Sequence, residues 1–267
     1  MVCKLAAADV AIACAGGTGG EQNDRTSLEL DQHAFLTALA ASDAAAATPL
    51  VVLAFAPGAI VASPWAAGAS AVLNMFLPGE QAGHAAADVL LGAVNPSGRL
   101  PVTFLDSAAD ATPICETELH CPLTEGLAVG WRGLIGKTVA FPFGHGLSYT
   151  SFAYAWSATP RLAAAGGGAG LVEMAVTVTN AGGVAGREVV QLYLEYPPSA
   201  AEPPLVLRHF HRTALLAPAE SETVTFVLSE RDVSIWAAGA WARAPGSFKA
   251  VVGASSRDHR LTETFVI

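Results

Sequence analysis

A change of hydrophobic pattern part-way along the chain constrains the fold more than any other feature. In the first half, short apolar runs bounded by Gly, Pro or Asn alternate with segments of helical spacing. The helical segments lie around residues 35–40 and 80–91. The runs that predict strands cover residues 9–15, 49–55, 71–76 and 100–104. Alternating strands and helices predict an α/β layer built on a mostly parallel sheet.

From Leu171 onward the residues alternate with period two and are rich in β-branched and aromatic types. The segments that show this are LVEMAVTVTN, REVVQLYLE, ETVTFVLS, GSFKAVVG and LTETFVI. Turn residues separate them, which is typical of a β-sandwich. We therefore expect an α/β domain over residues 1–156 and an all-β domain over residues 157–267, with a linker or exposed loop at 157–170.

Composition and charge exclude several classes of partner. The 267 residues are 52% hydrophobic, which supplies ample core for one or two domains. A net charge of −9 leaves no basic field for nucleic acid or anionic lipid. Apolar windows such as residues 50–61 are interrupted by Pro and Gly and are shorter than the about 20 residues of a membrane span. We expect a soluble protein that binds neither nucleic acid nor membrane.

The cysteines and the first residues say little about location. Cysteines at positions 3, 14, 115 and 121 lack the paired spacing of a zinc site, and we expect no metal or other cofactor. Cys115 and Cys121 close a small loop and could form a disulfide in an oxidising compartment. The first residues lack the apolar core of a signal peptide, so the sequence leaves the localisation unknown.

The stretch GGTGGEQNDR at residues 16–25 allows two interpretations. A phosphate-binding turn needs G-x-G-x-x-G at the start of a helix, but here Gln22 takes the third glycine position and Glu21 and Asp24 would repel a phosphate. The other interpretation is a loop after a parallel strand, whose Glu21 is either a general acid or base or an ordinary solvated glutamate. For Asp24 and Arg25, ordering of the loop is favoured over chemistry.

Several motifs, in order, resemble one family. The motifs of the first half are GGEQNDRTSLEL, LPGEQAGHAAADVLLGAVNPSGRLPVTF, TEGLAVGWR and FPFGHGLSYTSFAY. Together they resemble the second domain of glycoside hydrolase family 3, which implies an α/β/α sandwich. The segments at 176–194, 215–236 and 245–258 resemble the fibronectin type III-like domain that follows in many β-glucosidases and β-xylosidases of that family. The resemblance covers almost the whole chain.

The resemblance implies a retaining glycosidase. In the family, a carboxylate nucleophile on an N-terminal (β/α)8 barrel attacks the anomeric carbon. An acid on a loop of the second domain protonates the leaving oxygen and then acts as the base for water, and Glu21 matches that acid/base. The sequence has no room for the barrel, so we expect the C-terminal portion of a β-glucosidase-like enzyme, inactive without the barrel that is its partner.

Two alternatives to this expectation stay open. The upstream part could have been lost by truncation, or the chain could be a non-catalytic carbohydrate-associated or scaffolding protein built from the same domains. Truncation is favoured because the acid/base loop survives. The complete enzyme is expected to act on terminal β-D-glycosidic bonds of a β-glucoside or oligosaccharide, and the family suggests secretion.

Aromatic and histidine residues supply one more candidate. At residues 131–134 the sequence Trp-Arg-Gly-Leu replaces an aromatic-rich segment of the family, which leaves the preference between glucoside and xyloside open. Among the tryptophans, Trp131 lies close enough in the order of the motifs to be the one expected to bind substrate. His145, His209 and His211 are interpreted as structural. Core burial is the expected fate of the other tryptophans, at positions 65, 156, 236 and 241.

Overall fold

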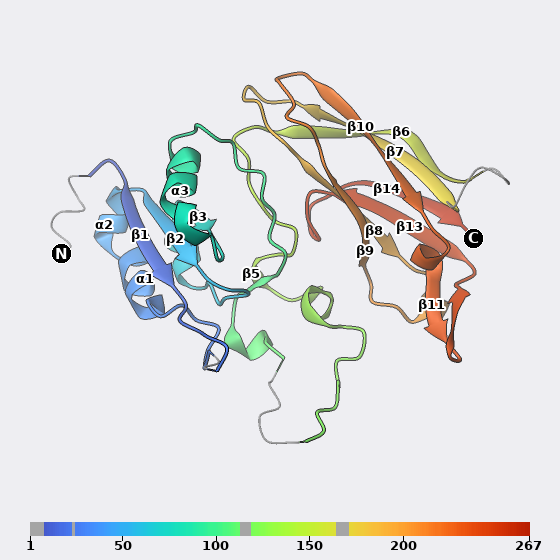
Figure 1. Ribbon diagram of the computed structural model, residues 1–267, viewed down its shortest axis with the longest axis horizontal. Helices are drawn as coiled ribbons and strands as arrows, with labels where there is room; N and C mark the ends of the chain where they lie inside the picture. Colours follow the sequence, from blue (N-terminus) through green and yellow to red (C-terminus); the bar gives the residue numbers. More distant parts are fainter. Residues whose placement is uncertain (1–7, 23–24, 113–118, 164–170) are drawn as a thin grey trace. The chain divides into compact units, whose positions relative to one another are not determined.

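The computed structural model describes residues 8–22, 25–112, 119–163 and 171–267. The chain divides into two compact units, shown in Figure 1. The α/β unit takes the described residues up to Val94 together with 102–122 and 136–141, and the β unit takes 95–101, 123–135 and 142–267. This confirms the expected combination of an α/β part and an all-β part.

The α/β unit is built on a parallel sheet, as expected. Its strands lie in the order β1 (Ala11–Gly16), β2 (Leu50–Phe55) and β3 (Ala71–Asn74). The central strand β2 is mostly buried, which suits a parallel strand with a near-continuous apolar run. In β1 the small residues Ala11, Ala13 and Ala15 are buried, whereas Ile12 and Cys14 are exposed.

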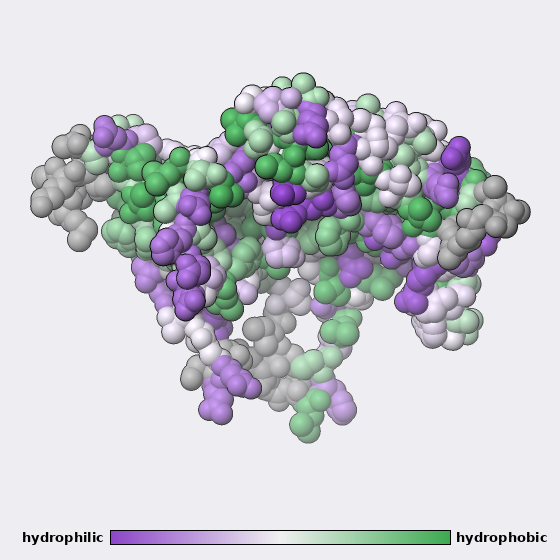
Figure 2. All heavy atoms as spheres, turned by 45° about the horizontal axis from the view of Figure 1, so that its top comes forward, coloured by the Kyte–Doolittle hydropathy of each residue, from purple (hydrophilic) through white to green (hydrophobic). Residues whose placement is uncertain are grey.

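Three α-helices of the described chain belong to this unit: α1 (His33–Ala40), α2 (Asp43–Ala47) and α3 (Ala82–Leu90). α1 buries Leu36 completely, and α3 buries Ala86. Figure 2 shows hydrophobic side chains on the visible surface of the unit, whose exposed apolar residues include Leu77 and Leu91. No described helix is long and apolar enough to cross a membrane.

The strand expected at residues 100–104 is wrong for most of its length. Only Phe104 belongs to a strand, β4 (Phe104–Leu105), which pairs with β5 (Val139–Phe141). Leu100 instead donates its N–H to the carbonyl of His145, at 2.8 Å. Pro101, which follows, lacks the N–H that a ladder would need, so the apolar run does not continue as a strand.

The β unit is a sandwich of two antiparallel sheets. One sheet contains β6 (Phe152–Leu162), β7 (Val172–Asn180) and β10 (Ser221–Leu228), in the order β10-β7-β6. The other contains β8 (Val189–Glu195), β9 (Val206–Arg212), β13 (Ser247–Gly253) and β14 (His259–Val266), in the order β14-β13-β8-β9. Alternate residues of β7 are buried, as the period-two pattern predicts, and join the core between the sheets.

The sequence patterns missed three smaller parts of this unit. Residues 157–162 continue β6, so they form a strand where a linker was expected. The expected domain boundary between residues 156 and 157 falls within this strand, and the division into domains stays a prediction. A hairpin of β11 (Ser234–Ala237) and β12 (Ala240–Arg243) lies outside both sheets. Short 3₁₀ helices are found in this unit at Gly130–Leu134 (η5), Pro198–Ala200 (η6) and Arg231–Val233 (η7), and in the α/β unit at Trp65–Gly68 (η2), Gly79–Gln81 (η3) and Ala108–Asp110 (η4).

A tight backbone turn at Gly144 fits the FGHG motif against β8. Gly144 has φ +80°, and a Cβ there would lie 2.2 Å from Oε1 of Gln191. Gln191 cannot move aside easily, because it is buried and its Nε2 donates to the carbonyls of Gly144 and Ala254, at 3.1 and 2.7 Å. Its Oε1 accepts from the hydroxyl of Tyr193 at 2.5 Å.

We predict that Gly144→Ala lowers the free energy of unfolding by about 2 kcal/mol or more, through a strained φ and overpacking against Gln191. Gly183→Ala is the matched control, because a Cβ at Gly183 meets no atom within 4 Å. Urea denaturation of both variants measures the difference. Equal stability of the two would contradict the argument.

Candidate functional site

The glycine-rich loop begins and ends at the carboxyl edge of the parallel sheet. β1 ends at Gly16, and the N–H of Gly17 donates to the carbonyl of Phe55, the last residue of β2, at 3.0 Å. The loop returns to the same edge, where the N–H of Asp31 donates to the carbonyl of Gly16 at 2.9 Å. This is the edge at which α/β sheets bind ligands.

Glu21 lies on a turn of this loop with its side chain exposed. In the described part of the chain, no hydrogen bond or ion pair holds its carboxyl group. The group is therefore accessible to a ligand or to a second domain. Asp24, expected to order the loop, lies outside the described residues.

The arm of the loop before Glu21 is fixed to the start of the next helix. Asp31 accepts hydrogen bonds from the hydroxyl of Thr18, at 2.5 Å, and from its N–H, at 3.1 Å. These bonds hold the pKa of the Asp31 carboxyl below its usual value, since they favour the ionised form. The N–H of Gly16 also donates to Oε1 of Gln32, at 2.8 Å.

Arg25 crosses the glycines of the loop. Its guanidinium donates to the carbonyls of Glu29, at 3.2 Å, and Ala59, at 3.4 Å. A Cβ at Gly17 would lie 3.3 Å from Nε of Arg25, and one at Gly19 would lie 3.2 Å from its Cγ. The glycines thus leave room for the arginine side chain, which gives them a reason other than phosphate binding.

Trp131, expected to bind substrate, lies in η5 within the β unit. Its indole stacks on the ring of Phe143, with centroids 5.1 Å apart and planes 12° apart. It meets the ring of Tyr193 edge-on at 5.6 Å. One indole face is therefore covered, and only the opposite face or the edge could meet a sugar; its binding role stays a prediction.

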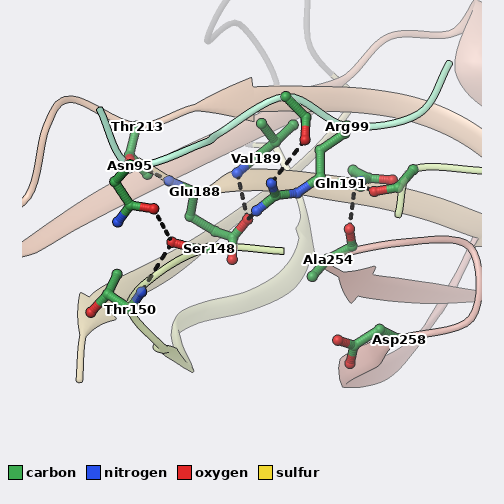
Figure 3. Close-up of polar contacts among 12 residues, drawn as sticks. Asn95, Arg99, Ser148, Thr150, Glu188, Val189, Gln191, Thr213, Ala254 and Asp258 are labelled. Atoms are coloured by element: carbon green, nitrogen blue, oxygen red, sulfur yellow. Dashed lines mark hydrogen bonds and ion pairs between the residues drawn. The ribbon is translucent and has the colours of Figure 1, made fainter. Parts of the chain in front are cut away.

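The NPSGRLP segment, residues 95–101, makes a set of polar contacts that sequence reasoning did not foresee (Figure 3). Oδ1 of Asn95 accepts from the hydroxyl of Ser148, at 2.9 Å, and from the N–H of Tyr149, at 2.8 Å. Its Nδ2 donates to the carbonyl of Ala185 at 3.0 Å. Asn95 therefore ties the residues after the FGHG turn to the sandwich.

Arg99 and Glu188 form a buried ion pair beside these contacts (Figure 3). Nη2 of Arg99 lies 2.6 Å from Oε1 of Glu188, and their side chains are 8% and 6% exposed. Glu188 also accepts from the N–H of Val189 at 2.6 Å.

The ion pair affects two titratable neighbours. Burial, together with the charge of Glu188, raises the pKa of Tyr154. Burial and the charge of Arg99 lower the pKa of His145. Both shifts keep these groups neutral near pH 7, which suits a structural role.

Family models match both parts of the chain. The model described as the glycosyl hydrolase family 3 C-terminal domain matches residues 2–149, more than half of the sequence. The chain belongs to glycosyl hydrolase family 3. The model of the fibronectin type III-like domain matches residues 188–256, within the sandwich.

Named relatives of this family 3 chain are β-glucosidases. It is 42% identical to β-glucosidase cel3A of Pyricularia oryzae over 221 residues, which covers 75% of this chain and 30% of that protein. It is 37% identical to probable β-glucosidase D of Emericella nidulans over 281 residues, covering 97% of this chain and 34% of that protein. The chain thus spans about a third of the length of these relatives.

Solved structures that match this chain are also β-glucosidases. The β-D-glucoside glucohydrolase of Trichoderma reesei matches with a TM-score of 0.86 and 32% identity, over 100% of this chain and 42% of that one. A family 3 β-glucosidase of Bifidobacterium adolescentis matches with a TM-score of 0.89 and 31% identity, over 100% of this chain and 40% of that one. The expected family, with its α/β and fibronectin type III-like parts, is confirmed.

Two cysteines of this family 3 chain lie in its described part, one in a disulfide and one free. Cys121 is disulfide-bonded, and Cys14 is free and exposed. Cys115, its expected partner, lies outside the described residues, so that pairing stays a prediction. Among the described side chains, no group of three or more His, Cys, Asp or Glu residues is placed to hold a metal ion.

We predict that Arg99→Met lowers the free energy of unfolding by about 3–5 kcal/mol, because it leaves the buried carboxylate of Glu188 without its partner. Arg161→Met is the control, since Arg161 and Glu173 are 72% and 40% exposed and pair at 3.9 Å; such surface pairs contribute about 0–1 kcal/mol. Chemical denaturation measures both variants. A similar small loss for both would show that the Arg99 pair does not hold the segment.

A second prediction concerns Asp31. In Thr18→Val the hydroxyl bond to the ionised carboxyl is lost, so the pKa of Asp31 should rise toward its ordinary value. Carboxyl-carbon NMR titration measures the pKa, with Thr179→Val as a control distant in sequence, whose hydroxyl bonds Ser221. In the wild type, stabilisation of the loop by this bond is present above the ordinary pKa and is lost as the pH falls through the lowered one. An unchanged titration in Thr18→Val would contradict the assignment.

Proposed function

We propose that this chain is the C-terminal portion of a retaining β-glycosidase of the β-glucosidase type, which hydrolyses terminal β-D-glycosidic bonds. In this proposal Glu21 is the general acid/base, and the nucleophile lies on an N-terminal barrel domain of the complete polypeptide. The names of the family 3 relatives support a β-glucoside or β-linked oligosaccharide as the substrate.

The observation that carries this proposal is the position of Glu21. Its exposed carboxyl stands on a loop at the carboxyl edge of the parallel sheet, where α/β domains bind ligands. Both arms of the loop are fixed, by the Thr18–Asp31 bonds before Glu21 and by Arg25 after it. A carboxyl group that is accessible while its loop is held in place suits proton transfer to a substrate that another domain attacks.

The chemistry divides between two carboxyl groups. A carboxylate of the barrel attacks the anomeric carbon and forms a glycosyl-enzyme, while the Glu21 carboxylic acid gives its proton to the leaving glycosidic oxygen. In the second step the Glu21 carboxylate takes a proton from water, which attacks the anomeric carbon and releases the sugar. Retention requires the two carboxyl groups to lie about 5–5.5 Å apart, so the loop must place Glu21 at that distance from the nucleophile.

Supporting roles follow from the contacts of neighbouring residues. We assign loop ordering to Arg25, through its bonds to Glu29 and Ala59, and extend it to Asp24 as an expectation. Trp131 offers its uncovered face or edge to the substrate, which makes it a weaker candidate than Glu21. The disulfide at Cys121 supports an oxidising, extracellular location.

The test of this function is Glu21→Gln in the complete polypeptide that carries this chain together with its barrel. Activity should fall about 100-fold or more on substrates with poor leaving groups, since general acid catalysis contributes about that factor or more. It should fall much less on activated aryl glycosides, which need little protonation. Glu29→Gln, at another exposed glutamate of the same loop, is the control and should leave both activities unchanged.

Two outcomes would contradict the proposal. Equal losses on both kinds of substrate would remove Glu21 from the acid role. A complete polypeptide with no glycosidase activity would favour the alternative, a non-catalytic carbohydrate-associated or scaffolding protein of the same domains.

A further inference from the structure

The β11–β12 hairpin presents two tryptophans to solvent. Trp236 and Trp241 are direct cross-strand partners, with ring centroids 5.4 Å apart. Ile235, the neighbour of Trp236, packs against the core of the sandwich. By contrast Trp236 is 60% exposed and Trp241 is 46% exposed. The hairpin is thus anchored through its apolar neighbour, and the indole pair faces outward, against the expectation that these tryptophans are buried.

Charged side chains hold and border this indole pair. The guanidinium carbon of Arg231 lies 3.2 Å from the ring centroid of Trp241, a cation–π contact that covers one face of that ring. Arg243 binds Glu230 through two hydrogen bonds, at 2.8 and 2.6 Å, and both side chains are about half exposed. Trp236 is therefore the more open platform, and Arg243 lies two residues along β12 from Trp241, the cross-strand partner of Trp236.

The size and charge of this surface indicate what it binds. A tryptophan side chain has roughly 250 Å² of surface, so the exposed parts of the pair come to roughly 250 Å², well below the about 800 Å² per partner of a stable protein interface. Residues 230–243 carry two acidic and two basic side chains, so the local charge is balanced and favours an uncharged ligand. A sugar ring has an apolar face that fits an indole and hydroxyls that pair with guanidinium and carboxylate groups.

We propose that the hairpin is a binding site for an uncharged sugar chain, with Trp236 as the stacking platform and Glu230 and Arg243 as hydroxyl partners. The choice of a β-linked glucan as the ligand rests on the proposed function. The binding itself requires neither Glu21 nor a barrel, so it can be tested on this chain alone and can fail independently of the catalytic proposal.

The experiment is native affinity electrophoresis of the full chain in gels that contain a soluble mixed-linkage β-glucan, an α-glucan or polygalacturonate. The β-glucan should retard the wild type, and Trp236→Ala should bind it about tenfold more weakly, the factor for the loss of one good contact. Trp236→Phe, which keeps an aromatic platform, should retain most of the retardation. Phe210→Ala is the matched control, because Phe210 is 68% exposed on β9 and should not affect binding.

Several results would overturn the proposal. They are no retardation of the wild type by either glucan, retardation by polygalacturonate alone, and equal retardation of wild type and Trp236→Ala. Retardation by the α-glucan alone would keep the site and overturn the choice of a β-linked ligand. Self-association in sedimentation that Trp236→Ala abolishes, without glucan binding, would assign the pair to contact between copies. If Trp236→Ala fails to fold, the indole N–H resonances of the wild type supply the test. Cellohexaose should shift the Trp236 resonance and leave the resonance of buried Trp65 in place. An unmoved Trp236 resonance would refute the site.

Discussion

The buried ion pair between Arg99 and Glu188 is the interaction on which the position of the NPSGRLP segment in the β unit depends most. A charge of either sign is costly inside a protein unless it is paired, so each of these side chains fixes the other. The partners are 89 residues apart in the chain, and their contact holds the NPSGRLP segment on the sandwich. Asn95 extends the same set of contacts to the residues after the FGHG turn.

The loop that carries Glu21 is arranged on a different principle. Polar contacts fix its arms while the carboxyl group itself is left exposed, and the glycines allow Arg25 to lie across the loop. A group that must exchange protons with a bound substrate needs both accessibility and a defined position. In the proposed enzyme the barrel supplies the nucleophile, and the α/β unit delivers the proton.

Most of the fold could be predicted from local patterns, and the exceptions have particular causes. The apolar runs gave β1, β2 and β3, and period-two alternation gave β7, β8, β10, β13 and β14. The predicted strand at 100–104 is wrong because Pro101 and the bonds of Leu100 to the FGHG turn prevent a ladder there. Residues 157–162 are small and polar in part, like a linker, yet pairing with β7 makes them a strand.

By itself the sequence determined the two fold classes, the family to which the motifs belong, and Glu21 as the acid to consider. These depend on the spacing of neighbouring residues, which the chain carries with it. Only the tertiary structure decided that Arg25 fills the space above the loop glycines, that Arg99 meets Glu188, and that Trp236 and Trp241 face solvent while Trp65 is buried. Burial and pairing are set by which distant surfaces meet, and no local pattern records that.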